Sequence, residues 1–118
     1  MHLDERIVGD VIVLAPAGRM TRDENFGVLP HRVRDLVKEW RRKMVLDLAG
    51  VSYMDSTCLG EIVSGFVTVR KNGGLMRFAS PTPRVERLME VAGLMAVFKT
   101  FPSEQDAVES LAGSLPES

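Results

Sequence analysis

The sequence is poor in residues that mark several common classes of protein. Its 118 residues include one cysteine and two histidines, and aromatic residues make up 6% of the chain. A single cysteine forms no internal disulfide and supplies no zinc cluster, and His2 and His31 stand far apart with no ligand spacing around them. We therefore expect a reducing compartment, no metal site and no cofactor.

An excess of charge and a long apolar run are also missing. The formal net charge is −1, which provides no field to attract nucleic acid. No segment approaches the roughly 18 uninterrupted apolar residues of a membrane span. The stretch MHLDERIVGD, residues 1–10, carries acids where a signal peptide is basic. We expect a cytoplasmic protein with no direct nucleic-acid binding and no membrane insertion.

The residues that are present suit one globular domain. Hydrophobic residues make up 45% of the chain, and its length is enough for a single core. We predict a domain over residues 1–112 and a flexible tail over residues 113–118.

Apolar patterning predicts alternating strands and helices. Two β-branched runs on either side of Gly9-Asp10 predict an opening hairpin over residues 6–14, with Gly9 first in a type II′ turn. Further strands are predicted at 44–48, 75–79 and 97–101, and helices at about 26–41, 58–72, 83–93 and 103–111. The order predicts an α/β fold of about five strands and four helices, with a mostly parallel sheet.

Some local features of this pattern are less regular. Residues 17–23 read as a polar loop, and Phe26 and Trp40 fall on the apolar face of the first helix. Pro30 requires that helix either to start near it or to be kinked there. Asp47 is expected to be buried and hydrogen-bonded inside its apolar strand.

The stretch YMDSTCLGEI, residues 53–62, places an acid, two hydroxyls and the sole thiol at a strand-to-helix joint. The first turn of a helix stabilises an anion, so a phosphate on Ser56 would be well placed beside Asp55. Plain helix capping by Asp55 or Ser56 explains the same residues without any function. Cys58 starts the apolar stripe, which favours a structural role over an activated thiol.

At this joint the sequence resembles a known family. The stretch VLDLAGVSYMDSTCLGEI, residues 45–62, resembles the phosphorylation segment of bacterial anti-sigma factor antagonists, which are STAS domains (sulfate transporter and anti-sigma factor antagonist). Further similarity lies in APAGRMT at residues 15–21, in the turn at residues 71–74 and in the helix at residues 85–93. The resemblance implies the STAS fold, whose order of elements matches the predicted order.

The resemblance implies a regulatory binding protein instead of an enzyme. In this family the unphosphorylated antagonist binds an anti-sigma factor, which is also a serine kinase with a histidine-kinase-like ATP fold, and so frees a sigma factor. Phosphorylation by the kinase breaks the complex, and a serine phosphatase resets it. By position in the motif, Ser56 corresponds to the phosphoacceptor, Asp55 to its acidic neighbour and Thr57 to the second hydroxyl residue, the second choice for phosphorylation.

The resemblance also implies a docking surface made of this joint, the start of the following helix and the loop after the second strand. In this chain the predicted partner-binding residues are Gly18, Met20, Thr21, Asp23, Met54, Asp55, Ser56, Thr57, Cys58 and Glu61. The chain departs from the family pattern at Cys58, where Gly is usual, and this departure bears on which kinase fits. Gly60 matches the last small residue of the motif.

Three alternatives compete with this interpretation. A response-regulator receiver needs an acidic pair after its first strand to hold magnesium, and the nearby loop offers Gly18-Arg19 instead. A STAS scaffold in a stress-sensing assembly and a STAS accessory subunit of a lipid or anion transporter both stay open. A transporter partner, instead of a soluble kinase, would distinguish the last of these.

Overall fold

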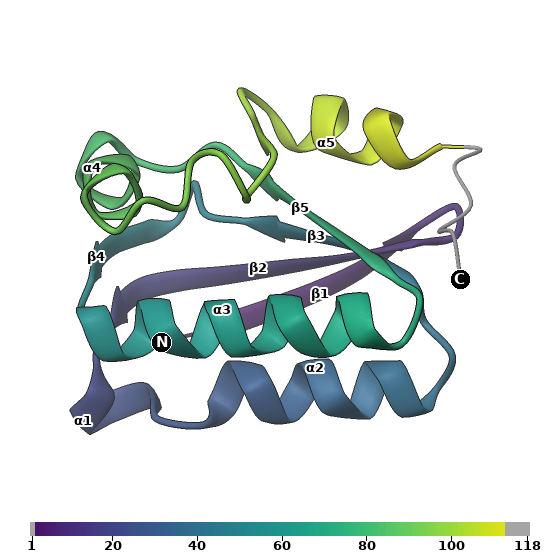
Figure 1. The fold of residues 1–118 in the computed structure, drawn as a ribbon, viewed down its shortest axis with the longest axis horizontal. Helices are drawn as coiled ribbons and strands as arrows, with labels where there is room; N and C mark the ends of the chain where they lie inside the picture. Colours follow the sequence, from purple (N-terminus) through teal and green to yellow (C-terminus); the bar gives the residue numbers. More distant parts are fainter. Residues whose placement is uncertain (1, 113–118) are drawn as a thin grey trace.

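The computed structural model describes residues 2–112, which form one six-stranded mixed sheet with helices packed against it (Figure 1). Along the chain the elements are β1 (His2–Val8), β2 (Val11–Met20), α1 (Arg22–Asn25), α2 (Val28–Lys38), β3 (Lys43–Asp47), β4 (Val51–Met54), α3 (Ser56–Lys71), β5 (Leu75–Ala79), α4 (Pro83–Val91), β6 (Thr100–Phe101) and α5 (Glu104–Leu111). The predicted α/β class is confirmed. The short elements α1 and β4 account for the extra helix and strand. The predicted flexible tail at residues 113–118 lies outside the described residues.

The sheet is mostly parallel and opens with the predicted hairpin. Its strand order is β1-β2-β3-β5-β6, with β4 paired to β2; only β1 and β2 are antiparallel. Gly9 adopts a φ of +63° in the two-residue hairpin turn, a conformation that glycine reaches at little cost.

Alternate residues of the central strands pack on opposite faces of the sheet. Ile12 and Leu14 of β2 join the larger core, which α2, α3 and α4 cover. Val11 and Val13 of the same strand join a smaller core beneath α5. Figure 1 shows α2 and α3 side by side on one side of the sheet, with α5 on the other. Burial on both faces explains why the central strands read as continuous apolar runs.

The predicted loop at residues 17–23 is wrong in its first part. Strand β2 continues to Met20, and its last three residues pair with β4, with a shift in register at a β-bulge between Gly18 and Arg19. Gly18 and Arg19 are both exposed and neither is apolar, so this part of the strand lacks an apolar signal. The pairing partner, β4, is only four residues long and equally hard to predict.

The first long helix differs at both ends from the prediction. It starts at Val28, so Pro30 lies in the first turn, where a missing N–H costs little, and the kinked alternative is wrong. Phe26 and Trp40 lie outside the helix and are 68% and 78% exposed, not on its apolar face. Gly27, at a φ of +83°, separates Phe26 from the helix.

The second half of the chain follows the prediction closely. Thr82 caps α4 with Pro83 at its first position, and Ser103 caps α5. The last strand is shorter than expected, because only Thr100 and Phe101 pair with β5.

Asp47, at the end of β3, is half-buried instead of buried, and its carboxylate accepts a hydrogen bond from the Ala49 N–H at 2.9 Å.

Candidate functional site

The ends of two parallel strands bring the candidate site together. Met20 pairs with Met54, and the Asp55 N–H donates to the Met20 carbonyl at 3.1 Å. Both strands then lead directly into helices, β2 through Thr21 into α1 and β4 through Asp55 into α3. Residues 35 positions apart in the sequence therefore meet at the carboxyl edge of the sheet, where open α/β sheets carry their sites.

Asp55 links the starts of the two helices. One carboxylate oxygen accepts the Cys58 N–H at 2.9 Å, which caps α3, and the other accepts the Arg22 N–H at 2.8 Å, at the start of α1. These hydrogen bonds, first that from Cys58 and then that from Arg22, lower the pKa of Asp55 below its usual value. Asp55 therefore stays ionised at neutral pH and holds the loop after β2 against the joint.

Ser56 is the first residue of α3, and its side chain is exposed. Among the described residues its hydroxyl has no hydrogen-bond partner. The first turn of α3 itself contains no acidic residue, and the one carboxylate at this helix start is the capping Asp55, directly before Ser56. The neighbouring Thr57 is half-buried. Ser56 is thus the more accessible of the two hydroxyls.

Cys58 is buried, with no exposed surface. Its burial raises the pKa of the thiol to about 12, and the carboxylates of Asp55 and Glu61 add to the increase. A thiol with so high a pKa is almost wholly protonated at neutral pH and is a poor nucleophile. Cys58 therefore has the structural role that its place on the apolar stripe predicts.

A second carboxylate holds the start of α2. The Glu61 carboxylate accepts a hydrogen bond from the Gly27 N–H at 2.7 Å, directly before the first residue of α2. Glu61 also lines a hollow of about 370 Å³ between α2 and α3. The exposed Phe26 lines the same hollow, as does Gly60, above which the surface is open. An exposed phenylalanine over a hollow is a typical anchor at a protein interface.

The structure gathers the ten predicted partner-binding residues at one end of the molecule but buries three of them. Gly18, Asp23 and Ser56 are exposed, and Thr21, Asp55, Thr57 and Glu61 are half-buried. Three side chains that were expected on the partner-binding surface are instead buried: Met20, Met54 and Cys58, which are 2%, 4% and 0% exposed. The physical reason is that each continues the apolar face of a strand or helix into the core.

Sequence reasoning missed two contributors to the site. Arg22 supplies a backbone N–H to Asp55, and no pattern in the sequence could reveal that contact. The apolar spacing places Phe26 on a helix face, although Gly27 immediately after it is a signal for a break in the helix.

The described residues contain no group of three or more side chains able to hold a metal ion. None of the helices in the described part of the chain has the length and apolar character needed to cross a membrane.

Comparisons with known proteins show which proteins this chain is similar to. The family model for the STAS domain matches residues 4–107. A Thermotoga neapolitana protein, named as a homologue of an anti-sigma factor antagonist, is 31% identical over 92% of this chain and 96% of its own. The anti-sigma F factor antagonist of Paenibacillus polymyxa is 30% identical over 72% of this chain and 80% of its own length. A crystal structure of a related Thermotoga maritima protein superimposes with a TM-score of 0.86 at 27% identity, covering 93% of this chain and 94% of that one.

Proposed function

The chain belongs to the STAS domain family, and we propose that it acts as an anti-sigma factor antagonist controlled by phosphorylation of Ser56. In this proposal the unphosphorylated protein binds an anti-sigma factor that is also a serine kinase, and a sigma factor is released. Phosphorylation by the kinase breaks the complex, and a serine phosphatase restores it. The protein itself carries out no chemistry.

The observation that carries the proposal is the setting of the Ser56 hydroxyl. It is exposed and without a protein partner among the described residues, it begins a helix whose first turn lacks acids, and it lies next to an ionised Asp55. A kinase can reach such a hydroxyl without unfolding the helix. The phosphate would add about 1.5 to 2 negative charges at the surface that the partner must cover.

The same surface has the features of a docking site. The hollow between α2 and α3 lies one turn of helix from Ser56 and includes Thr57, Gly60 and the exposed Phe26. A partner that inserts into this hollow would cover the joint. Added charge on Ser56 would then be desolvated at the interface, and an unpaired charge in that position weakens binding.

The test begins with the partner. Tagged protein purified from its own cells, with mass spectrometry of the proteins that accompany it, identifies the cognate anti-sigma factor and any phosphorylated residue. Incubation of the purified pair with ATP should then add one phosphate to the wild type and none to Ser56→Ala. Thr57→Ala, the matched control, should be modified like the wild type. Modification of Ser56→Ala to the wild-type extent would show that the assigned residue is wrong.

A titration tests the charge switch. Ser56→Asp should weaken binding of the anti-sigma factor about tenfold or more, while Ser56→Ala should bind like the wild type. Unchanged affinity of Ser56→Asp would contradict a switch based on charge. If a membrane transporter accompanied the protein instead of a soluble kinase, with Ser56 unmodified, the accessory-subunit alternative would replace this proposal.

A further inference from the structure

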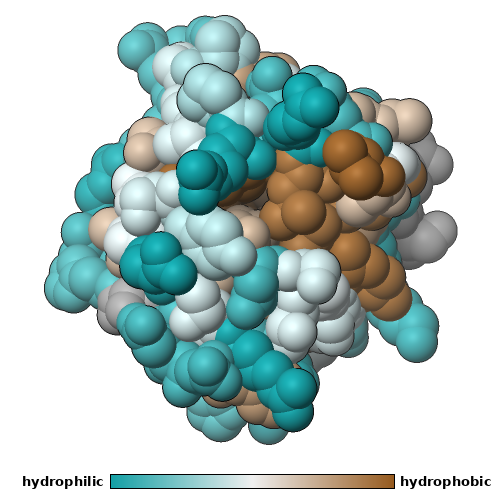
Figure 2. All heavy atoms as spheres, turned by 90° about the vertical axis from the view of Figure 1, so that its left-hand side faces the viewer, coloured by the Kyte–Doolittle hydropathy of each residue, from teal (hydrophilic) through white to brown (hydrophobic). Residues whose placement is uncertain are grey.

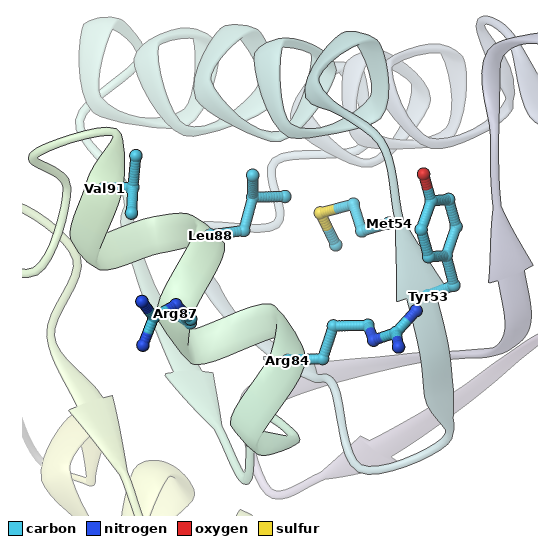
Figure 3. Close-up of a pocket in the computed structure, with 6 residues that line it drawn as sticks. All are labelled: Tyr53, Met54, Arg84, Arg87, Leu88 and Val91. Atoms are coloured by element: carbon cyan, nitrogen blue, oxygen red, sulfur yellow. The ribbon is translucent and has the colours of Figure 1, made fainter.

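A second concave surface lies on the other side of the joint, between α4 and β4 (Figure 3). It has a volume of about 520 Å³ and is lined by Tyr53, Met54, Arg84, Arg87, Leu88 and Val91; we call it the α4 groove. In Figure 3 Leu88 and Met54 point toward each other across the groove, and Arg84 extends toward Tyr53. Met54 directly precedes Asp55 in the chain, so the α4 groove and the joint that carries Ser56 share the end of β4.

Three of the residues that line the α4 groove are apolar. Met54 is almost fully buried, Leu88 is half-buried and Val91 is 79% exposed. Figure 2 looks onto this end of the molecule and shows apolar atoms gathered in one area, with hydrophilic atoms above and below it. An exposed apolar area bordered by polar groups is typical of a protein interaction site.

The rim of the α4 groove is positively charged. Arg84 and Arg87 are exposed, and neither forms an ion pair with any carboxylate in residues 2–112. The guanidinium carbons of Arg19 and Arg84 lie 4.6 and 5.7 Å from the centre of the Tyr53 ring. These cation–π contacts hold two of the cations near the aromatic ring but leave their charge without a counterion. An acidic ligand would supply that counterion.

We propose that the α4 groove docks a segment of a partner protein in which an apolar side chain lies next to one or two carboxylates. The apolar side chain would cover Val91 and Leu88, and the carboxylates would face Arg84 and Arg87, which can bind them in a bidentate manner. The groove is open to solvent, which suits a protein segment better than a small enclosed ligand. The proposal rests on the proposed function only in taking the anti-sigma factor as the natural source of this segment.

The first test uses a synthetic peptide, so it does not depend on finding the partner. Isotope-labelled protein is titrated with acetyl-Glu-Leu-Leu-Glu-amide and followed by amide NMR signals. Saturable shifts are expected at Tyr53, Met54 and the residues of α4. The matched peptide acetyl-Lys-Leu-Leu-Lys-amide should shift these signals at least about tenfold less at the same concentration, because it brings like charges to the arginines.

A charge-reversal variant tests the role of the rim. Arg84→Glu/Arg87→Glu should weaken binding of the acidic peptide at least about tenfold. Both residues are exposed, and an acid at position 84, in the first turn of α4, favours the helix, so the variant should stay folded. Arg41→Glu/Arg42→Glu changes the net charge equally at the connection between α2 and β3, at the opposite end in Figure 1, and should bind like the wild type.

Several results would overturn the proposal. They are a lack of shifts at the α4 groove, equal shifts with the acidic and basic peptides, or equal loss in both charge-reversal variants. Octanoate that bound the α4 groove as tightly as the peptide would indicate a site for a small amphipathic anion instead. Shifts at the α4 groove that grew with protein concentration alone would indicate a second copy of this chain.

The identified anti-sigma factor separates this proposal from the proposed function. If Ser56→Asp weakened its binding but Arg84→Glu/Arg87→Glu did not, the phosphorylation switch would stand and the α4 groove would not dock that partner. If the acidic peptide bound the α4 groove but no anti-sigma factor accompanied the protein, the groove would stand and the proposed function would fail.

Discussion

Helices α3 and α5 both begin with a side-chain N-cap, but the two caps lie in different surroundings. An oxygen of the Asp55 side chain accepts the Cys58 N–H at 2.9 Å, and the Ser103 hydroxyl accepts the Asp106 N–H at 3.1 Å. Each cap satisfies one of the backbone donors that a helix start leaves free. Both helix starts are therefore capped by a side chain, a carboxylate at α3 and a hydroxyl at α5.

The tertiary neighbours make the two starts different. The second oxygen of Asp55 binds the N–H of Arg22, 33 residues earlier, whereas the Ser103 cap reaches only its own helix. The first turn of α5 contains Glu104 and Asp106, but that of α3 contains no acid. The comparison teaches that a cap by itself does not mark a candidate site: what distinguishes α3 is the second segment that packs against its capping residue and the lack of acids within its first turn.

The largest expected difference between the two starts concerns a thiol at the third helical position. Asp106→Cys would place an exposed thiol in α5 at the position that Cys58 occupies in α3, so that one molecule carries both. At pH 8 the new thiol should react with a disulfide reagent at least about 1000-fold faster than Cys58. Burial and a pKa of about 12 keep Cys58 protonated, whereas an exposed thiol has a pKa of about 8.5.

Stopped-flow kinetics measure both reactions, and peptide mapping assigns each rate to its cysteine. The same protein unfolded in denaturant is the control, since both thiols should then react at similar rates. A native Cys58 that reacted within tenfold of the new thiol would show that the start of α3 opens readily, and the structural role of Cys58 would be wrong.

Removal of the caps should show a smaller difference between the two helix starts, with the greater loss of stability at the start of α3. Asp55→Ala should lower the free energy of unfolding by about 2 kcal/mol, because it removes both the cap and the link to Arg22. Ser103→Ala should lower it by about 1 kcal/mol, since only the cap is lost. Denaturant unfolding of the two variants measures the difference, and equal losses would mean that the Asp55 to Arg22 bond contributes nothing to stability.

Sequence patterns predicted the local features of this fold well, because those features depend on a few adjacent residues. Thr82 before Pro83 and Ser103 before α5 mark helix starts by their own chemistry, and both are found as predicted. The buried strands β3 and β5 read as apolar runs because both of their faces are covered. The hydroxyl and acid at the joint could likewise be read from residues 55–57.

The features that the sequence did not predict depend on contacts between distant segments. Strand β4 exists because it pairs with the end of β2, and the exposed Gly18 and Arg19 give no sign of that pairing. The two faces of the joint, the hollow beside Phe26 and the α4 groove, arise from how α2 and α4 pack, which apolar spacing alone does not fix. Surfaces of this kind become visible only when the elements are placed in space.

The smallest expected difference between the two helix starts is their response to acid. Hydrogen bonds from Cys58 and Arg22 lower the pKa of Asp55 in the folded state, so ionised Asp55 stabilises the fold above the pKa of the unfolded chain. This contribution is lost as the pH falls below about 4, toward the lower pKa of the folded state. The wild type should therefore exceed Asp55→Asn in stability at pH 7 by about 1 kcal/mol or less, after solvent screening, and the gap should narrow steadily as the pH falls below about 4. Ser103→Ala is the control, because no titrating group makes its cap: its deficit relative to wild type should stay constant over the same range. Denaturant midpoints at each pH measure both gaps, and a gap for Asp55→Asn that did not narrow in acid would show that its charge has no part in joining α1 to α3.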